Sequence, residues 1–144
     1  MFIGRCSVAL PTSKDHILQL NHLNLAVPDV AEARRFFETC FEFKCVDTKG
    51  ADTLAVLEGK GGFTLVLSNL DKSVAPVYPK DFHVGFILDS AEQVYKVFQQ
   101  LQSAGIELPH QPREMRGSLI FYCHVPGSIL LEVSCPLRQL VCEE

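Results

Sequence analysis

The sequence predicts an α+β fold in which two βαβββ modules form a cup-shaped mixed sheet with helices on its outer face. An internal repeat is the first observation: residues 22–41 superpose on residues 83–102 without a gap, so that His22 falls on His83. The second is that three short runs with the character of strands follow each copy. One such module cannot bury both faces of its sheet, so the two copies are expected to combine.

Each copy begins with a strand that leads into an amphipathic helix. Apolar side chains recur at helical spacing in both: Val30, Ala33, Phe37 and Cys40 in the first, and Ala91, Val94, Phe98 and Leu101 in the second. Residues typical of helix N-termini also mark where each helix is expected to begin. Ser90 and Gln93 have the spacing of a capping box, and Asp29 with Glu32 imitates it.

The three further strands of each module are expected in short runs separated by glycine or proline. They lie at 43–49, 52–59 and 62–69 in the first module, and at 106–111, 117–125 and 128–135 in the second. The expected organisation is an N-terminal extension (1–18), the first module (19–70), a proline-bearing linker (71–80), the second module (81–136) and a C-terminal tail (137–144).

Composition indicates a soluble globular protein and excludes several partners. Of 144 residues, 47% are hydrophobic and 21% charged, with a net charge of -4, so no basic excess favours nucleic acid. No apolar run approaches the roughly 20 residues of a membrane span. The six cysteines form no CxxC pair and mostly sit in apolar runs, which indicates a reducing compartment. We therefore expect a cytoplasmic protein without membrane or nucleic-acid partners.

Strand alternation places a distinctive set of polar side chains on the concave face. His22 shares its face with Asn24 and Ala26, while the leucines between them face the core. By the same alternation, His83 and Glu132 also face the cup. A buried carboxylate beside two imidazoles is costly unless a cation lies between them, so His22, His83 and Glu132 are candidate metal ligands. Structural histidines hydrogen-bonded within the protein are the alternative.

Two segments of the chain resemble the vicinal oxygen chelate superfamily, which includes glyoxalase I, extradiol dioxygenases, fosfomycin-resistance enzymes and bleomycin-resistance proteins. Residues 20–43, "LNHLNLAVPDVAEARRFFETCFEF", are similar to its opening strand and helix, and residues 121–133, "FYCHVPGSILLEV", to its closing hairpin. The resemblance implies a homodimer, a small-molecule substrate and one divalent metal ion that binds two adjacent substrate oxygens. Mixed nitrogen and oxygen ligands suit Mn, Fe(II), Ni or Zn.

The resemblance also suggests roles for other residues. Val66 stands where four-ligand members such as glyoxalase I carry a further Glu or Gln, so three ligands are expected here. Tyr122 matches a pocket tyrosine of the three-ligand members, and we expect Tyr122 and Glu132 to be catalytic. The expected substrate-binding residues are Asn24, Val66, Arg116, Ser118, Ile120 and His124. Arg113 and Arg138 are further candidates to contact an anionic substrate group at the rim.

Two functions remain open at this point. The sequence favours a metal-dependent lyase, transferase or dioxygenase of the glyoxalase-like type, because it retains three possible ligands. The alternative is a metal-free protein of the bleomycin-resistance type that sequesters a small molecule in the same cup. The sequence leaves open whether one chain or a dimer forms that cup.

Overall fold

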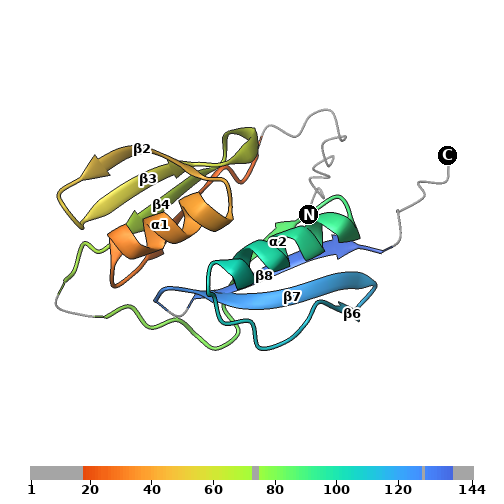
Figure 1. The fold of residues 1–144 in the computed structure, drawn as a ribbon. Coiled ribbons are helices and arrows are strands. Elements are labelled where there is room, and N and C mark those ends of the chain that lie inside the picture. The colour runs from red at the N-terminus through yellow and green to blue at the C-terminus, as the bar shows by residue number, and fades with distance from the viewer. Residues whose placement is uncertain (1–17, 73–74, 128, 138–144) are drawn as a thin grey trace, which may run out of the picture.

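The computed structural model describes residues 18–72, 75–127 and 129–137, and it contains two βαβββ modules side by side (Figure 1). The α+β fold class predicted from the internal repeat is confirmed. The expected extension at 1–18 and tail at 137–144 lie almost entirely outside the described residues. None of the helices in the described part of the chain is long and apolar enough to cross a membrane.

The first module pairs its strands in the order β1-β4-β3-β2, with β1 parallel to β4 and the other pairs antiparallel. Its elements are β1 (His22–Ala26), α1 (Val30–Cys40), β2 (Lys44–Lys49), β3 (Leu54–Glu58), a 3-10 turn (Lys60–Gly62) and β4 (Thr64–Ser68). The parallel pairing follows from the helix, which carries the chain back across the sheet.

The second module repeats this topology in the order β5-β8-β7-β6. Its elements are β5 (His83–Ile87), α2 (Ala91–Ser103), β6 (Arg113–Met115), β7 (Ser118–Val125) and β8 (Ile129–Pro136). Between described residues, no strand of one sheet pairs with a strand of the other. Within one chain the modules therefore contribute two four-stranded sheets.

One strand was predicted in the wrong place. Residues 106–111 were expected to form the second strand of the second module, but the strand there is β6, at Arg113–Met115. Pro109 and Pro112 explain the difference, because proline has no N–H to donate to a strand ladder. Pairing begins only after the second proline.

The helices begin at the residues that the sequence indicated. The Asp29 carboxylate accepts a hydrogen bond from the Glu32 N–H at 2.8 Å, and the Ser90 hydroxyl accepts one from the Gln93 N–H at 3.3 Å. The returning bond of the second cap comes from the Asp89 N–H, which donates to the Gln93 side chain at 2.9 Å. Both caps satisfy N–H groups that the helix itself cannot pair.

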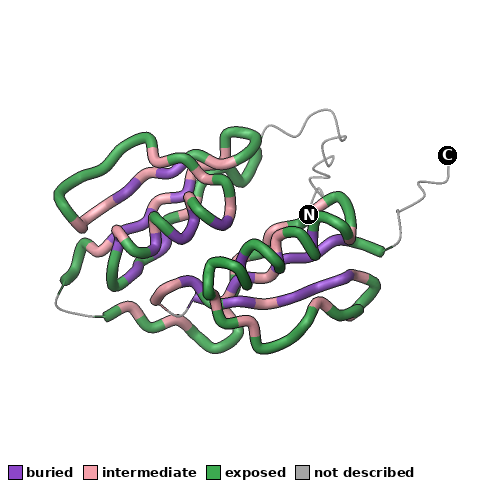
Figure 2. The backbone as a smooth tube through the Cα atoms, viewed as in Figure 1, coloured by how far each residue is buried: buried purple, intermediate pink, exposed green. Residues whose placement is uncertain are grey.

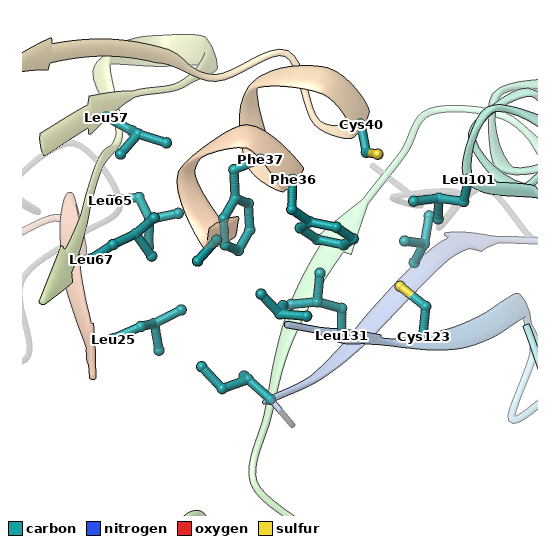
Figure 3. Close-up of a cluster of buried hydrophobic side chains, with 14 of the residues drawn as sticks. Leu25, Phe36, Phe37, Cys40, Leu57, Leu65, Leu67, Leu101, Cys123 and Leu131 are labelled. Carbon is teal, nitrogen blue, oxygen red and sulfur yellow. The ribbon is translucent and has the colours of Figure 1, made fainter. Parts of the chain in front are cut away.

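The helix-covered sides of the two sheets share one hydrophobic core. In Figure 3, Phe37 of α1 lies beside leucines of the first sheet, and Phe36 extends toward Leu131 and Cys123 of the second. In Figure 2 the buried residues lie on both helices and on strands of both sheets. Burial, and then the nearby Cys40 thiolate, raise the pKa of Cys123 to about 12, so this thiol is protonated at neutral pH.

Contacts between the modules fix their relative position. The ring of Phe41, just after α1, stacks on Phe86 of β5 with centroids 4.7 Å apart. The β7–β8 turn approaches the first module so closely that a Cβ at Gly127 would lie 2.6 Å from Pro28. From the linker, the Tyr78 hydroxyl donates to the Ala26 carbonyl at 2.8 Å.

A second carboxylate holds the start of α1, and its removal provides a test of the local fold. Asp52, between β2 and β3, accepts hydrogen bonds from the Val30 and Ala31 N–H groups at 2.8 and 3.1 Å. We expect Asp52→Ala to lower the free energy of unfolding by about 1–2 kcal/mol, as loss of a helix cap does. Asp52→Asn, which keeps an acceptor oxygen, should lose less in the same denaturant titration. Equal losses would show that the hydrogen bonds do not stabilise the helix.

Candidate functional site

The uncovered face of the second sheet brings three of the predicted site residues together. Tyr122 and Glu132 are register partners on β7 and β8, and Glu132 is also opposite Gly85 of β5. The Tyr122 hydroxyl donates to Glu132 Oε2 at 2.9 Å, and the same oxygen lies 3.7 Å from His83 Nε2. An added Cβ at Gly85 would meet nothing within 4 Å, so the space beside Glu132 is open.

Both predicted metal-binding histidines have their Nδ1 atoms engaged. His83 Nδ1 lies 3.0 Å from the Asp81 carbonyl oxygen, and His22 Nδ1 lies 2.8 Å from Asn21 Oδ1. Because both partners are acceptors, each Nδ1 carries the hydrogen, and in the neutral ring Nε2 keeps its lone pair. This is the arrangement in which histidines bind metals, with the second nitrogen hydrogen-bonded to an oxygen.

Tyr122 is held as a proton donor beside the Glu132 carboxylate. Burial raises the pKa of the Tyr122 hydroxyl, and the hydrogen bond to Glu132 and the charge of that carboxylate raise it further. The positive charges of Arg116 and Arg113 lower this pKa, although the net shift remains upward. The hydroxyl therefore stays protonated at neutral pH and can donate to an oxygen in the site.

The first sheet carries the remaining polar cluster on its own uncovered face. His22 and Asn24 are exposed on β1, and Asn24 is the register partner of Val66 on β4. The buried Ser68 hydroxyl donates to Asn24 Oδ1 at 2.7 Å, which leaves the Asn24 amide hydrogens available to a ligand. Val66 occupies the position in this sheet that Glu132 occupies in the second.

The structure divides the predicted metal ligands between the two modules. Among the described residues, no three His, Cys, Asp or Glu side chains gather into a group that could hold a metal ion. His83 and Glu132 do fit as a pair, because two donors 3.7 Å apart can share one ion at bond lengths of about 2.0–2.2 Å. A single chain therefore offers two donors at one place and the third, His22, on its other sheet.

The other predicted substrate-binding residues of the second module lie around this pair. Ser118, Ile120 and His124 alternate along β7 on the same face as Tyr122. Arg113 is the register partner of Ile120, and Arg116 lies in the β6–β7 turn with a φ of 51°, a conformation that favours glycine or asparagine. Arg138, a further candidate, lies outside the described residues.

Three contributing groups were missed by the sequence reasoning. Asn21 and the Asp81 carbonyl orient the two histidines, and Ser68 orients Asn24. Asn21 and Ser68 carried a weak signal, because both are polar residues at the ends of predicted strands. The Asp81 carbonyl carried none, since any residue supplies a backbone oxygen.

The comparisons with known proteins agree with this fold. A model of the Glyoxalase/Bleomycin resistance protein/Dioxygenase superfamily matches residues 19–133. A structure described as that of a possible glyoxalase from Bacillus cereus is 38% identical, with a TM-score of 0.71, and the match covers 82% of this chain and 99% of that chain. Comparison with curated protein sequences gives no match.

Two more distant structures show likeness of fold alone. A lactoylglutathione lyase from Agrobacterium tumefaciens is 20% identical, with a TM-score of 0.66, and the match covers 81% of this chain and 92% of that one. A glyoxylase/bleomycin resistance protein/dioxygenase domain from Frankia sp. EAN1pec is also 20% identical, with a TM-score of 0.72 and coverage of 83% and 98%.

The raised pKa of Tyr122 predicts how this residue titrates. The difference in tyrosinate absorbance between the wild type and Tyr122→Phe should have its midpoint above pH 10.0, the ordinary value. Because the folded state holds this proton more tightly, the stability it contributes is present below about pH 10 and is lost as the pH rises through the folded pKa. The free energy of unfolding should therefore fall more steeply with alkaline pH in the wild type than in Tyr122→Phe. A difference midpoint at or below pH 10.0 would contradict the assignment.

Proposed function

Because this chain belongs to the Glyoxalase/Bleomycin resistance protein/Dioxygenase superfamily, we propose that it is a metal-dependent enzyme acting on a small molecule with two adjacent oxygens. The observation that carries this proposal is the pair formed by His83 and Glu132. Its nitrogen and oxygen lie 3.7 Å apart on an open sheet face, and the Asp81 carbonyl fixes the imidazole with its Nε2 toward the carboxylate.

The proposed metal site is shared between two copies of the chain. His83 and Glu132 come from one copy, and His22 comes from the uncovered face of the first module in the other. Two observations support this proposal. Within one chain these donors lie on two different sheets, and in both histidines Nδ1 is hydrogen-bonded to an oxygen, which leaves the Nε2 lone pair for a metal. A two-fold dimer would repeat the pairing reciprocally and create two equal sites.

The side chains around the pair have distinct proposed roles. Tyr122 donates its hydroxyl hydrogen to a substrate oxygen, and Glu132 accepts a substrate proton at its carboxylate. The bound metal would supply Lewis-acid polarisation of the two substrate oxygens. Asn24, held by Ser68, donates from its amide across the shared site.

The substrate pocket is proposed to combine apolar and polar contacts. Val66 and Ile120 supply apolar surface, while Ser118 and His124 supply hydrogen-bonding groups on the Tyr122 face. Arg116 is proposed to bind an anionic part of the substrate, because its charge already acts on Tyr122. This mixture is typical of small-molecule sites.

Sequestration of a small molecule without metal is the second candidate function. One observation favours it: the Glu132 carboxylate already accepts the Tyr122 hydrogen bond and lies beside His83 without a third ligand from its own chain. A protonated His83 would complete this cluster as an ion pair. Metal content after loading distinguishes the two functions.

Metal retention is the direct test of the proposed ligands. Protein loaded separately with Mn, Fe(II), Ni or Zn and then desalted should retain one ion per chain with at least one of these metals. His22→Ala, His83→Ala and Glu132→Ala should each abolish retention, and acidification should release the ion because protons compete for the ligand atoms. His124→Ala and Glu58→Ala, which remove a histidine and a carboxylate outside the proposed ligand set, should retain it. No retention by the wild type would favour the metal-free binding protein.

A mixing experiment tests whether two copies share the site. His22→Ala and His83→Ala chains, mixed and allowed to exchange subunits, should regain about a quarter of the wild-type metal, because half of the dimers are mixed and each mixed dimer has one intact site. Mixing His83→Ala with Glu132→Ala should restore nothing, since both changes remove ligands from the same half-site. Equal results from the two mixtures would exclude a shared site of this composition.

A further inference from the structure

A cavity of about 520 Å³ lies between the modules, mainly on the helix-covered sides of their sheets. Leu23 and Leu25 of β1 line it from the first module, and Val84 and Phe86 of β5 line it from the second. These are the side chains that alternate with His22, Asn24, His83 and Gly85 along the same strands. The cavity therefore lies mainly on the opposite side of both sheets from the histidines, although at the edge strand β5 it is also bordered by Gly85 and Ile87.

A departure from the internal repeat explains why this space remains open. Position 36 of α1 is equivalent to position 97 of α2, and the residues there are Phe36 and Val97. Phe36 is 5% exposed in the shared core, whereas Val97 lines the cavity. The other α2 residues at the cavity are Gln93, Lys96 and Gln100, whose polar ends are poorly suited to filling an apolar space.

The lining indicates the chemistry of a ligand. Phe37, Phe41, Phe43, Phe63 and Phe86 all contribute to the wall, and Phe43 meets Phe86 edge-on with centroids 6.3 Å apart. The aromatic ring of a ligand binds favourably to such a cluster of phenylalanines through stacked or edge-to-face contacts. The charged residues of the lining are two acids and two bases, Glu42, Asp89, Lys60 and Lys96, so the cavity has no net charge to attract an ion.

We propose that this cavity is a second binding site, distinct from the cup, for a neutral aromatic small molecule. Its volume lies within the range of about 300–1,000 Å³ found for small-molecule sites. Phe41 and Phe86 belong to different modules and stack on each other with centroids 4.7 Å apart, so a ring packed against this pair contacts both halves of the protein. The ligand is recognised by apolar and aromatic contact rather than by charge.

A matched pair of fluorescent probes tests the site and its charge preference. N-phenyl-1-naphthylamine is neutral, and 8-anilinonaphthalene-1-sulfonate adds a sulfonate to the same ring system. We expect the full chain to bind the neutral probe saturably, with one probe per chain, and to bind the anionic probe more weakly. Val97→Phe, which restores the residue of the first module and fills the space, should weaken binding of the neutral probe by about tenfold or more.

Controls make each outcome decisive. Gln99→Phe adds the same ring to α2 outside the cavity lining and should bind the probe as the wild type does. Val97→Leu serves if Val97→Phe fails to fold, and it should weaken binding by a smaller factor. His83→Ala should bind normally, so loss of the proposed metal site leaves this test intact. The proposal would be overturned if the wild type did not bind the neutral probe saturably, or if the Val97 variants bound it with the same affinity as the wild type. Tighter binding of the anionic probe than of the neutral probe would also overturn it.

Discussion

Burial of one face of each sheet is the constraint on which the rest of this structure depends. Leu25 and Leu131 are almost fully buried beneath the helices, and in a strand their neighbours must point the other way. That alternation places His22 and Asn24 on one uncovered face and Glu132 on the other. The polar side chains are thus displayed by the same packing that forms the core, and a shift of one residue in register would exchange the two sets.

On the second sheet, the Glu132 carboxylate organises its neighbours. It accepts the Tyr122 hydrogen bond, lies beside His83 Nε2 and has open space above Gly85. These features belong together, because a partly buried carboxylate needs hydrogen-bond or charge partners, while a ligand needs access. The pKa of Tyr122 is raised by burial and by this carboxylate, so the tyrosine stays a donor.

The two modules share one topology but have diverged at positions that matter for chemistry. Val66 and Glu132 occupy equivalent register positions, yet only the second can bind a proton or a metal. Phe36 and Val97 are equivalent on the helices, yet the phenylalanine is buried in the core and the valine borders a cavity. Different residues at equivalent positions of one shared topology therefore give the second module both a polar site on its sheet and an apolar cavity beside its helix.

The sequence by itself determined the modules, their helices and the outward direction of the predicted ligands. Helical and strand periodicities are local properties, so the stripe ending at Cys40 and the alternation around His22 were readable without a structure. Local signals failed at 106–111, where Pro109 and Pro112 prevented pairing although Ile106 and Leu108 alternate with polar residues as in a strand. The backbone oxygen that orients His83 carried no sequence signal.

Only the tertiary structure decided which of these residues meet. It joined His83, Glu132 and Tyr122 on one sheet and left His22 with Asn24 on the other, because each set is fixed by strand pairing within its own module. It also showed that the helix-covered sides pack together through Phe36 and Phe41, leaving the polar faces uncovered. Such distances depend on how two folded modules pack, and no local pattern in the sequence specifies that arrangement.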